Sequence, residues 1–291
     1  MAISAFPIAL TFEPSQTTDL SVLKLFRFND IEIKTLEELA RSVMHTRSLK
    51  RGIRLISSSP ITRNYGLGTS TRIALSLVEA LLILNEEVAT MESILRLSGR
   101  GGASGIGAHT YFHGGACLDI GRRRDGQGFA SSEARGPSSD RPLVVGVTAV
   151  PDWPLQILLP RLPAVSPEIE NAYFSTATPL SKEAVHEAAY VSLFGVFGGI
   201  ASSDYPVFCR ALNRLQALPW KRGEISLHGD ELLKIIQYAN ENGADAVAMS
   251  SFGPTLACFG AVREAGLGVI VEKQQIINTR PRNAGREISL A

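Results

Sequence analysis

Runs of alternating apolar and polar residues predict strands, and runs with apolar residues every three or four positions predict helices. The predicted strands are 6–13, 31–33, 51–57, 143–147, 155–159, 246–248, 256–259 and 268–271. A hairpin around Gly114 and Gly115 is predicted to pair 111–112 with 116–120. The predicted helices are 35–46, 71–84, 90–97, 181–197, 205–216 and 230–240.

The strongest helical pattern lies in residues 71–84. Its apolar residues follow the 3.6-residue period and are Ile73, Ala74, Leu77, Ala80, Leu81 and Leu84. Thr35 is predicted to cap the helix 35–46, because a threonine hydroxyl accepts a hydrogen bond from the first turn. Gly99 is predicted to end the helix 90–97, since glycine readily adopts the left-handed conformation found after a helix.

Predicted strands stand at both ends of the chain with helices between them, so the fold class is α+β rather than a regular strand–helix alternation. We expect two packed halves, 1–145 and 146–291. Segment 121–141 is rich in Arg, Ser, Gly and Pro and is predicted to be a flexible insertion. Its three consecutive arginines either lie in solvent or hold an anion.

Composition excludes several classes of function. The 291 residues are 45% hydrophobic and 20% charged, with a net charge of +1, so no strong overall field attracts nucleic acid. No apolar run approaches the ~18 residues of a membrane span, and no signal peptide is predicted. The three widely spaced cysteines are expected to be reduced thiols, as in a cytoplasmic protein.

Three glycine-rich stretches are the candidate chemistry of this chain. They are Tyr65-Gly66-Leu67-Gly68-Thr69-Ser70-Thr71, Arg100-Gly101-Gly102-Ala103-Ser104-Gly105-Ile106-Gly107-Ala108-His109 and Met249-Ser250-Ser251-Phe252-Gly253-Pro254-Thr255. Glycine lets backbone N–H groups approach an anion, and the first stretch leads directly into a predicted helix, whose N-terminus attracts phosphate. The alternative is that these glycines serve only tight turns and close packing.

The first and third stretches resemble the phosphate loop and the C-terminal motif of the GHMP superfamily, the galacto-, homoserine, mevalonate and phosphomevalonate kinases. The resemblance implies a two-layer fold with an N-terminal half like ribosomal protein S5 and a C-terminal half like ferredoxin. Three motifs in the same order make it much more specific than one Gly-x-Gly would be.

Within that superfamily the chain most resembles the β-ribofuranosylaminobenzene 5′-phosphate synthases. The match runs from Gly99 to Gly107, then includes an aromatic pair and Gly114-Gly115. The tail Thr279-Arg280-Pro281-Arg282-Asn283-Ala284-Gly285 resembles the same family. Together these similarities extend over nearly the whole chain.

This resemblance implies transfer of a ribosyl group from phosphoribosyl pyrophosphate (PRPP) to an aromatic carboxylate, with loss of CO2 and pyrophosphate. The expected acceptor is 4-aminobenzoate, as in methanopterin biosynthesis; related enzymes make C-nucleosides from heterocyclic carboxylates. Mg²⁺ is expected as a cofactor held by substrate oxygens, and ATP is not expected. The resemblance further implies a cytoplasmic homodimer that binds neither nucleic acid nor membrane.

Gly107 stands where mevalonate-type kinases carry an aspartate that orients or deprotonates the attacking hydroxyl. Glycine has no side chain to accept a proton. A small-molecule kinase remains an alternative, since phosphoryl transfer depends mainly on positioning and charge neutralisation.

The candidate site residues fall into groups by role. The predicted PRPP contacts are Gly66, Leu67, Gly68, Thr69, Ser70, Thr71, Gly101, Gly102, Ser104, Gly105, Gly107, Ser250, Ser251 and Gly253. Arg100 and His109 are the predicted catalytic residues, and Arg72, Tyr111 and Phe252 are candidates for acceptor binding, with core packing the alternative for the two aromatics. Asp119 is the candidate metal ligand if one exists, the alternative being a role at a strand end.

The chain departs from the family pattern at its start. Members begin with an additional strand and turn before the segment that matches 5–13, and its absence is expected to leave an exposed sheet edge. A mis-assigned start, a natural shortening and a degraded paralogue are the alternatives. A non-catalytic paralogue therefore stands beside the enzymatic hypotheses.

Overall fold

The computed structural model describes residues 1–63, 65–102, 104–122, 141–263 and 275–290. Up to residue 119 its elements are β1 (Leu10–Ser15), the 3₁₀ helix η1 (Ser21–Phe26), α1 (Asp30–Arg47), β2 (Gly52–Ser58), α2 (Thr69–Leu84), α3 (Met91–Ser98), α4 (Ile106–His113) and β3 (Ala116–Asp119). The later elements are β4 (Val144–Thr148), β5 (Leu155–Leu158), α6 (Pro167–Ala177), α7 (Lys182–Tyr190), the π-helical η2 (Val191–Phe197), α8 (Gly198–Ala201), α9 (Tyr205–Gln216), α10 (Pro219–Ser226), α11 (Gly229–Glu241), β6 (Ala244–Met249), β7 (Leu256–Gly260) and β8 (Ile276–Thr279).

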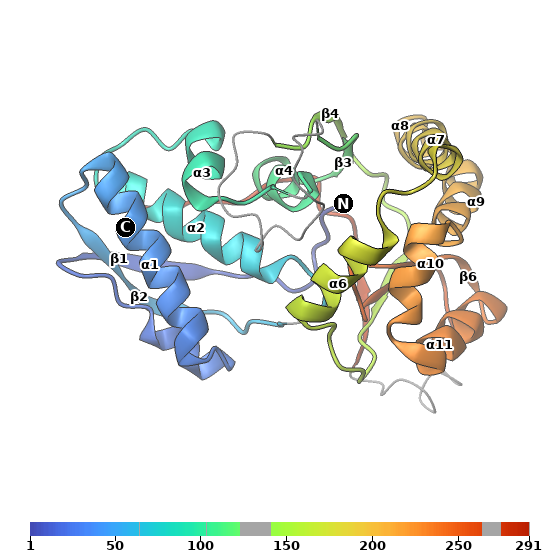
Figure 1. Cartoon of the computed structure of the whole chain (residues 1–291), viewed down its shortest axis with the longest axis horizontal. Helices are drawn as coiled ribbons and strands as arrows, with labels where there is room; N and C mark the ends of the chain where they lie inside the picture. The colour runs from blue at the N-terminus through green and yellow to red at the C-terminus, as the bar shows by residue number, and fades with distance from the viewer. Residues whose placement is uncertain (64, 103, 123–140, 264–274, 291) are drawn as a thin grey trace.

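Helices cover a two-stranded antiparallel sheet at the N-terminal end of the molecule. β1 pairs with β2 from Leu10 opposite Ser58 to Ser15 opposite Gly52. The apolar face of α2 packs into the core formed with α1, α3 and this sheet, and its Leu75, Leu81 and Leu82 have no exposed surface. Figure 1 shows these elements together at one end of the molecule.

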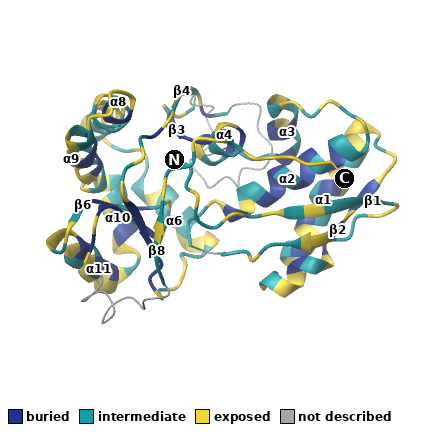
Figure 2. Cartoon of the chain, turned by 180° about the vertical axis from the view of Figure 1, so that it is seen from behind, coloured by how far each residue is buried: buried dark blue, intermediate teal, exposed yellow. Residues whose placement is uncertain are grey.

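The C-terminal elements form a second layer structure. Four antiparallel strands lie in the order β6-β7-β5-β8, and α9 and α11 pack against β6. Leu158 and Leu232 are fully buried beneath these helices. In Figure 2 the strands and the inner faces of the helices are mostly buried, while the outer helix faces are exposed.

Between the two ends lie α4 and a two-stranded sheet in which β3 pairs antiparallel with β4. The C-terminal tail returns from β8 across α4 to the N-terminal helices (Figure 1). The Gly115 N–H donates to the Arg282 carbonyl at 2.7 Å, and the Arg286 N–H donates to the Tyr111 carbonyl at 2.8 Å. The tail therefore ties α4 to both ends of the molecule.

The predicted hairpin around Gly114 and Gly115 is wrong. Residues 111–112 belong to α4, and β3 pairs with β4, whose Thr148 stands opposite Ala116. A local pattern cannot show that the partner strand lies after the 121–141 segment, because pairing is set by tertiary contacts.

The predicted strand 31–33 is also wrong, since it lies in the first turn of α1. The helix begins five residues before Thr35, because Asn29 and Glu32 form a capping box in which each side chain accepts the other residue's backbone N–H. The Thr35 hydroxyl instead donates to the Ile31 carbonyl inside the helix.

Other predicted elements are confirmed to within a few residues. Thr90 caps α3 and Gly99 ends it in the left-handed conformation, as expected. Helices α6 and α10 were missed, and the single helix predicted at 181–197 is α7 continued by a π-helical turn. The predicted strand 268–271 and most of the predicted insertion lie outside the described residues, and the predicted division into halves stays a prediction.

Among the described residues, one helical stretch is long and apolar enough, by length and composition alone, to cross a membrane. It is Lys182–Ala201, with a mean hydropathy of 1.3. Helices of globular folds pass the same test, so this stretch is weak evidence for a membrane location.

Candidate functional site

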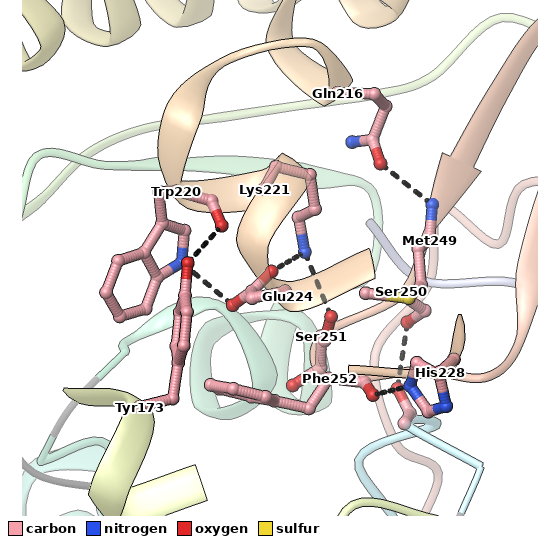
Figure 3. Close-up of polar contacts among 11 residues, drawn as sticks. Tyr173, Gln216, Trp220, Lys221, Glu224, His228, Met249, Ser250, Ser251 and Phe252 are labelled. Carbon is pink, nitrogen blue, oxygen red and sulfur yellow. Dashed lines mark hydrogen bonds and ion pairs between the residues drawn. The ribbon is translucent and has the colours of Figure 1, made fainter. Parts of the chain in front are cut away.

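The three glycine loops meet around the first turn of α2. The Ser250 hydroxyl donates to the Gly66 carbonyl at 2.8 Å, so the third loop lies directly against the first (Figure 3). A Cβ atom at Gly66 would stand 2.3 Å from the Ser250 carbonyl oxygen. On the other side, a Cβ atom at Gly107 would lie 3.7 Å from Thr71 Cγ2. Segments that are far apart in sequence thus form one site.

No side chain among the described residues caps the N-terminus of α2. Its N-cap is Gly68, which has a left-handed φ of 68° and no side chain to accept a hydrogen bond from the first turn. Gly68 and Ser70 are exposed, and a Cβ atom at Gly68 would meet no atom within 4 Å. The unsatisfied N–H groups and the helix dipole make this end suitable for an anion.

The Thr69 hydroxyl is not available to a ligand in this arrangement. Thr69 is buried, and its hydroxyl donates to the Thr62 carbonyl at 2.7 Å. Of the three predicted hydroxyls in this loop, those of Ser70 and Thr71 lie nearer to solvent. The loop's contribution to anion binding therefore rests mainly on backbone N–H groups.

Arg72 braces the first loop, and its predicted contact with the acceptor stays a prediction. Its guanidinium donates to the Phe6 carbonyl at 2.9 Å and to the Leu67 carbonyl at 3.2 Å. Burial lowers the pKa of this guanidinium. In the described part of the chain, its buried Nε has no hydrogen-bond partner. Because its partners are neutral, Arg72 adds positive potential beside the open helix end.

Asp119 lies at the end of β3, where its carboxylate binds the loop before α4, and its candidate metal-ligand role stays a prediction. Its Oδ2 accepts the Gly105 N–H at 2.7 Å and lies 3.3 Å from the Ser104 hydroxyl, and its Oδ1 accepts the Gly121 N–H at 2.7 Å. Gly105 is the N-cap residue of α4, so this carboxylate lies at the positive end of the helix dipole. The described residues contain no group of three His, Cys, Asp or Glu side chains suited to a metal.

Asp119→Ala is expected to lower the free energy of unfolding by about 1–2 kcal/mol, because it leaves the Gly105 and Gly121 N–H groups without their carboxylate acceptor. Urea titration measures this loss. Asp204→Ala is the matched control, since Asp204 caps α9 through the Val207 N–H at 3.0 Å. A loss of stability in Asp119→Ala well below that in Asp204→Ala would contradict this role of Asp119 before α4.

The glycines of the second loop are mostly buried. Gly101, Gly102 and Gly105 are all buried, and a Cβ atom at Gly105 would stand 2.8 Å from Val144 Cγ2. Close packing therefore favours glycine at position 105. This agrees with the alternative that the glycines of this loop serve tight turns and close packing. The contacts of these glycines with PRPP stay a prediction. So does the catalytic role of Arg100, whose backbone N–H donates to the Ser98 hydroxyl at 3.3 Å.

His109 and His113 lie one turn apart on α4, with ring centroids 6.2 Å apart. Burial is the main cause that lowers the pKa of His109, His113 lowers it further, and Asp119 opposes them. The imidazole is therefore mainly neutral at neutral pH and able to donate or accept a hydrogen bond. Its predicted catalytic role is untested.

Tyr111 points into the core rather than toward an acceptor. Its hydroxyl donates to Glu79 Oε2 at 2.7 Å, and burial raises its pKa well above the usual value. Glu79 is buried and receives Arg286 of the tail, with Nη2 at 2.7 Å and Nε at 3.1 Å from Oε1. These contacts agree with core packing, the alternative for Tyr111, and its role in acceptor binding stays a prediction.

Side chains of α10 and the start of α11 hold the third loop from behind (Figure 3). The Lys221 ammonium donates to the Ser251 carbonyl at 2.9 Å and pairs with Glu224. His228 Nε2 lies 2.6 Å from the Phe252 carbonyl. Two consecutive carbonyl groups are thereby anchored away from the first loop. Ser251, at a φ of 51°, takes the left-handed turn that this requires.

Phe252 belongs to an aromatic cluster on the same loop. Its ring lies 6.0 Å from Tyr173, 5.8 Å from Phe174 and 6.5 Å from Trp220, measured between centroids. The Trp220 indole N–H donates to Glu224 Oε1 at 2.8 Å. These contacts agree with core packing, the alternative role for Phe252. Its stacking on an acceptor stays a prediction.

Lys221→Met is expected to lower the free energy of unfolding by about 3 kcal/mol, because it leaves the buried Glu224 without its cation. Lys24→Met is the matched control, since Lys24 pairs with Asp30 on the surface, where both side chains are more than half exposed. Urea titration compares the two.

The double variant Lys221→Met with Glu224→Gln separates stability from loop anchoring. Removing both charges is expected to recover most of the stability. It cannot restore the lost hydrogen bond to the Ser251 carbonyl, so the enzymatic turnover of both variants is expected to be lower than that of the wild-type protein. Recovery of stability and turnover together would contradict the anchoring role.

Sequence reasoning missed the residues behind the third loop and the Glu79–Arg286 pair. The role of Glu79 could have been suspected from sequence, because it is a lone acid among the apolar positions of the 71–84 helix. Lys221 and Glu224 carried only a weak one, a charged pair three residues apart in a segment without clear periodicity.

Comparison with known proteins identifies the family. The chain is 30% identical over 249 residues to the beta-ribofuranosylphenol 5′-phosphate synthase of Archaeoglobus fulgidus, which covers 82% of this chain and 77% of that protein. The chain belongs to the beta-ribofuranosylphenol 5′-phosphate synthase family. The protein of the same name from Methanocaldococcus jannaschii is 27% identical over 253 residues, covering 81% of this chain and 74% of that protein. No protein-family model matches the chain.

Solved structures confirm the GHMP-type α+β fold of this synthase-family member. The mevalonate kinase of L. major in complex with R-mevalonate superimposes with a TM-score of 0.67 at 15% identity, covering 97% of this chain and 88% of that one. Mevalonate pyrophosphate decarboxylase from Streptococcus pyogenes gives 0.58 at 9% identity, covering 98% and 87%. At these identities the likeness concerns the fold alone.

Proposed function

We propose that this synthase-family member is a PRPP-dependent C-ribosyltransferase that joins a phosphoribosyl group to a para-substituted benzoate, with release of CO2 and pyrophosphate. The observation that carries the proposal is the convergence of three loops on the N-terminus of α2, which no described side chain caps, beside the half-buried guanidinium of Arg72. Family membership supports it, because the relatives' name describes a ribofuranosyl 5′-phosphate attached to a phenol.

The α2 N-terminus would hold the pyrophosphate of PRPP. As the bond between the anomeric carbon and the pyrophosphate oxygen breaks, its electron pair moves to the leaving group, whose charge the N–H groups and Arg72 stabilise. The ring carbon that bears the carboxylate forms the new carbon–carbon bond. The carboxylate then leaves as CO2, and its bonding electrons restore the aromatic ring.

Magnesium fits this site as an ion carried by the substrate. The Ser70 side chain is exposed in the first turn of α2 and offers one hydroxyl oxygen, while the pyrophosphate supplies the others. When bound, the ion would neutralise charge on the leaving pyrophosphate. The chain's own residues orient that group and exclude alternative positions for it.

The position of Gly107 favours ribosyl transfer over phosphorylation of an alcohol. It faces Thr71 beside the open helix end, where a carboxylate would be needed to orient a hydroxyl. We therefore propose that ATP is not a substrate. A phosphorylated product formed from ATP and a small alcohol would overturn the proposal.

Pyrophosphate release from PRPP with Mg²⁺ is the test, run with 4-aminobenzoate and separately with 4-hydroxybenzoate. Both acids are included because the relatives' name describes a phenol. Carboxyl-labelled acid reports CO2. Equal amounts of pyrophosphate and CO2 with either acid support the proposal. Binding of PRPP without release of either product would favour a heterocyclic acceptor, and absence of binding would favour a non-catalytic paralogue.

A further inference from the structure

A cavity of about 340 Å³ lies between α3 and α4, next to the second glycine loop. Its lining residues are Met91, Glu92, Leu95, Gly101, Gly105, Ala108, His109, Arg141 and Pro142. This volume falls within the range of small-ligand sites. Nothing in the proposed binding of pyrophosphate at α2 uses this cavity.

The cavity walls suit a flat, apolar ring. Met91, Leu95 and Ala108 present apolar surface, and two glycines without side chains leave room between them. Gly101 has a left-handed φ of 83°, a conformation that glycine adopts at little energetic cost. This part of the cavity wall therefore carries no side chain. A planar aromatic ring gains the most from such a slot, because burying it removes apolar area from water.

The polar groups favour an anion on that ring. Arg141 lines the cavity; burial lowers the pKa of its guanidinium, the charge of Glu92 opposes this and the charge of Arg96 adds to it. His109 lines the cavity as a mainly neutral imidazole. An arginine can hold a carboxylate through two parallel hydrogen bonds, and the neutral imidazole can add a third.

The cavity and the anion site share the first turn of α4. Gly107 faces Thr71 at the start of α2, while Ala108 and His109 line the cavity. Residues adjacent in sequence therefore border both the cavity and the start of α2. This placement suits a reaction that joins two substrates.

We propose that this cavity binds the aromatic carboxylate acceptor, with Arg141 holding its carboxylate and His109 completing the contact. The inference rests on the proposed ribosyl transfer for its choice of ligand. It adds a binding residue, Arg141, that belongs to the segment predicted from sequence as a flexible insertion.

Calorimetry tests the assignment with two probes, 4-aminobenzoate and its uncharged amide, 4-aminobenzamide, each titrated in the presence of Mg²⁺ and pyrophosphate. Arg141→Gln is expected to weaken binding of the acid at least about tenfold, the factor for one lost charge-assisted hydrogen bond. Binding of the amide and of pyrophosphate is expected to change less than about twofold. A merely structural role for Arg141 would weaken both aromatic probes alike.

Arg96→Gln is the matched control, because it removes the same charge near the cavity from a residue that does not line it. It is expected to keep acid binding within about threefold, as for an exposed charge. Loss of acid and amide binding together, no loss in Arg141→Gln, or no binding by the wild-type protein would overturn the inference.

The product assay distinguishes this inference from the proposed function. Release of pyrophosphate and CO2 with an unchanged acid KM in Arg141→Gln would leave the function standing and overturn the acceptor site. Arg141-dependent binding of the acid without release of either product would do the reverse.

Discussion

Gly66→Ala is expected to reduce pyrophosphate release from PRPP by at least about a hundredfold. The left-handed φ of 72° at this position costs an L-residue about 1–2 kcal/mol. The larger effect is steric, because the new Cβ would stand 2.3 Å from the Ser250 carbonyl oxygen. The first or third loop must move, and the contact between them is lost.

Two other glycines provide the comparison. Gly229→Ala carries the same backbone strain, at a φ of 70°, with no atom within 4 Å of the new Cβ. Its loss of stability by urea titration therefore measures the strain alone. Gly68→Ala also has open space, but its methyl group enters the region assigned to the anion. It is expected to weaken PRPP binding without separating the loops.

The measurement is the ratio kcat/KM for PRPP, together with the Kd of pyrophosphate by calorimetry. Gly66→Ala is expected to lose both, with a destabilisation that exceeds that of Gly229→Ala by about 1–3 kcal/mol, as is usual for overpacking. Turnover within tenfold of the wild type would show that the close approach of these two loops does not form the site.

Arg286→Met is expected to lower the free energy of unfolding by about 3–5 kcal/mol, because it leaves a buried carboxylate without its cation. Glu79 is 4% exposed, and Arg286 binds it through two nitrogens from the far end of the chain. The change also releases the tail that packs on α4, where a Cβ atom at Gly285 would lie 2.0 Å from the Phe112 carbonyl oxygen.

Arg280→Met is the matched control. It removes the same charge from an ion pair with Asp152 in which the side chains are 72% and 62% exposed. Such a pair contributes about 0–1 kcal/mol. The double variant Arg286→Met with Glu79→Gln is expected to regain part of the stability, because no buried charge remains unpaired. Equal losses in the two single variants would contradict the buried network.

The resemblance of the tail to the family also gains a physical explanation from these contacts. The Asn283 amide exchanges hydrogen bonds of 2.8 and 2.9 Å with the backbone of Val150. Gly285 lies where any side chain would strike α4. This tail motif, which helped to indicate the family, therefore positions α4. It does not lie at the N-terminus of α2.

Much of this protein could be predicted from local sequence. The periodic apolar residues of α2 bury themselves as expected, and Thr90 and Gly99 delimit α3, because propensity and capping act within a few residues. The order of the glycine loops indicated the family, which the relatives confirm. The structure brings these loops together through the Ser250–Gly66 hydrogen bond and the approach of Gly107 to Thr71, and their contacts with a ligand stay a prediction.

The tertiary structure decided which glycine loop is open. Both α2 and α4 begin with a glycine-rich stretch, but only the stretch before α2 is predicted from sequence to lead into a helix. The Asp119 carboxylate takes up the Gly105 N–H of the second loop, whose glycines are mostly buried, whereas Gly68 of the first loop is exposed. The pairing of Arg286 with Glu79, 207 residues apart, was likewise beyond local pattern. Such contacts depend on which distant surfaces pack together, since a hydrogen bond or ion pair has no signature along the chain between its partners.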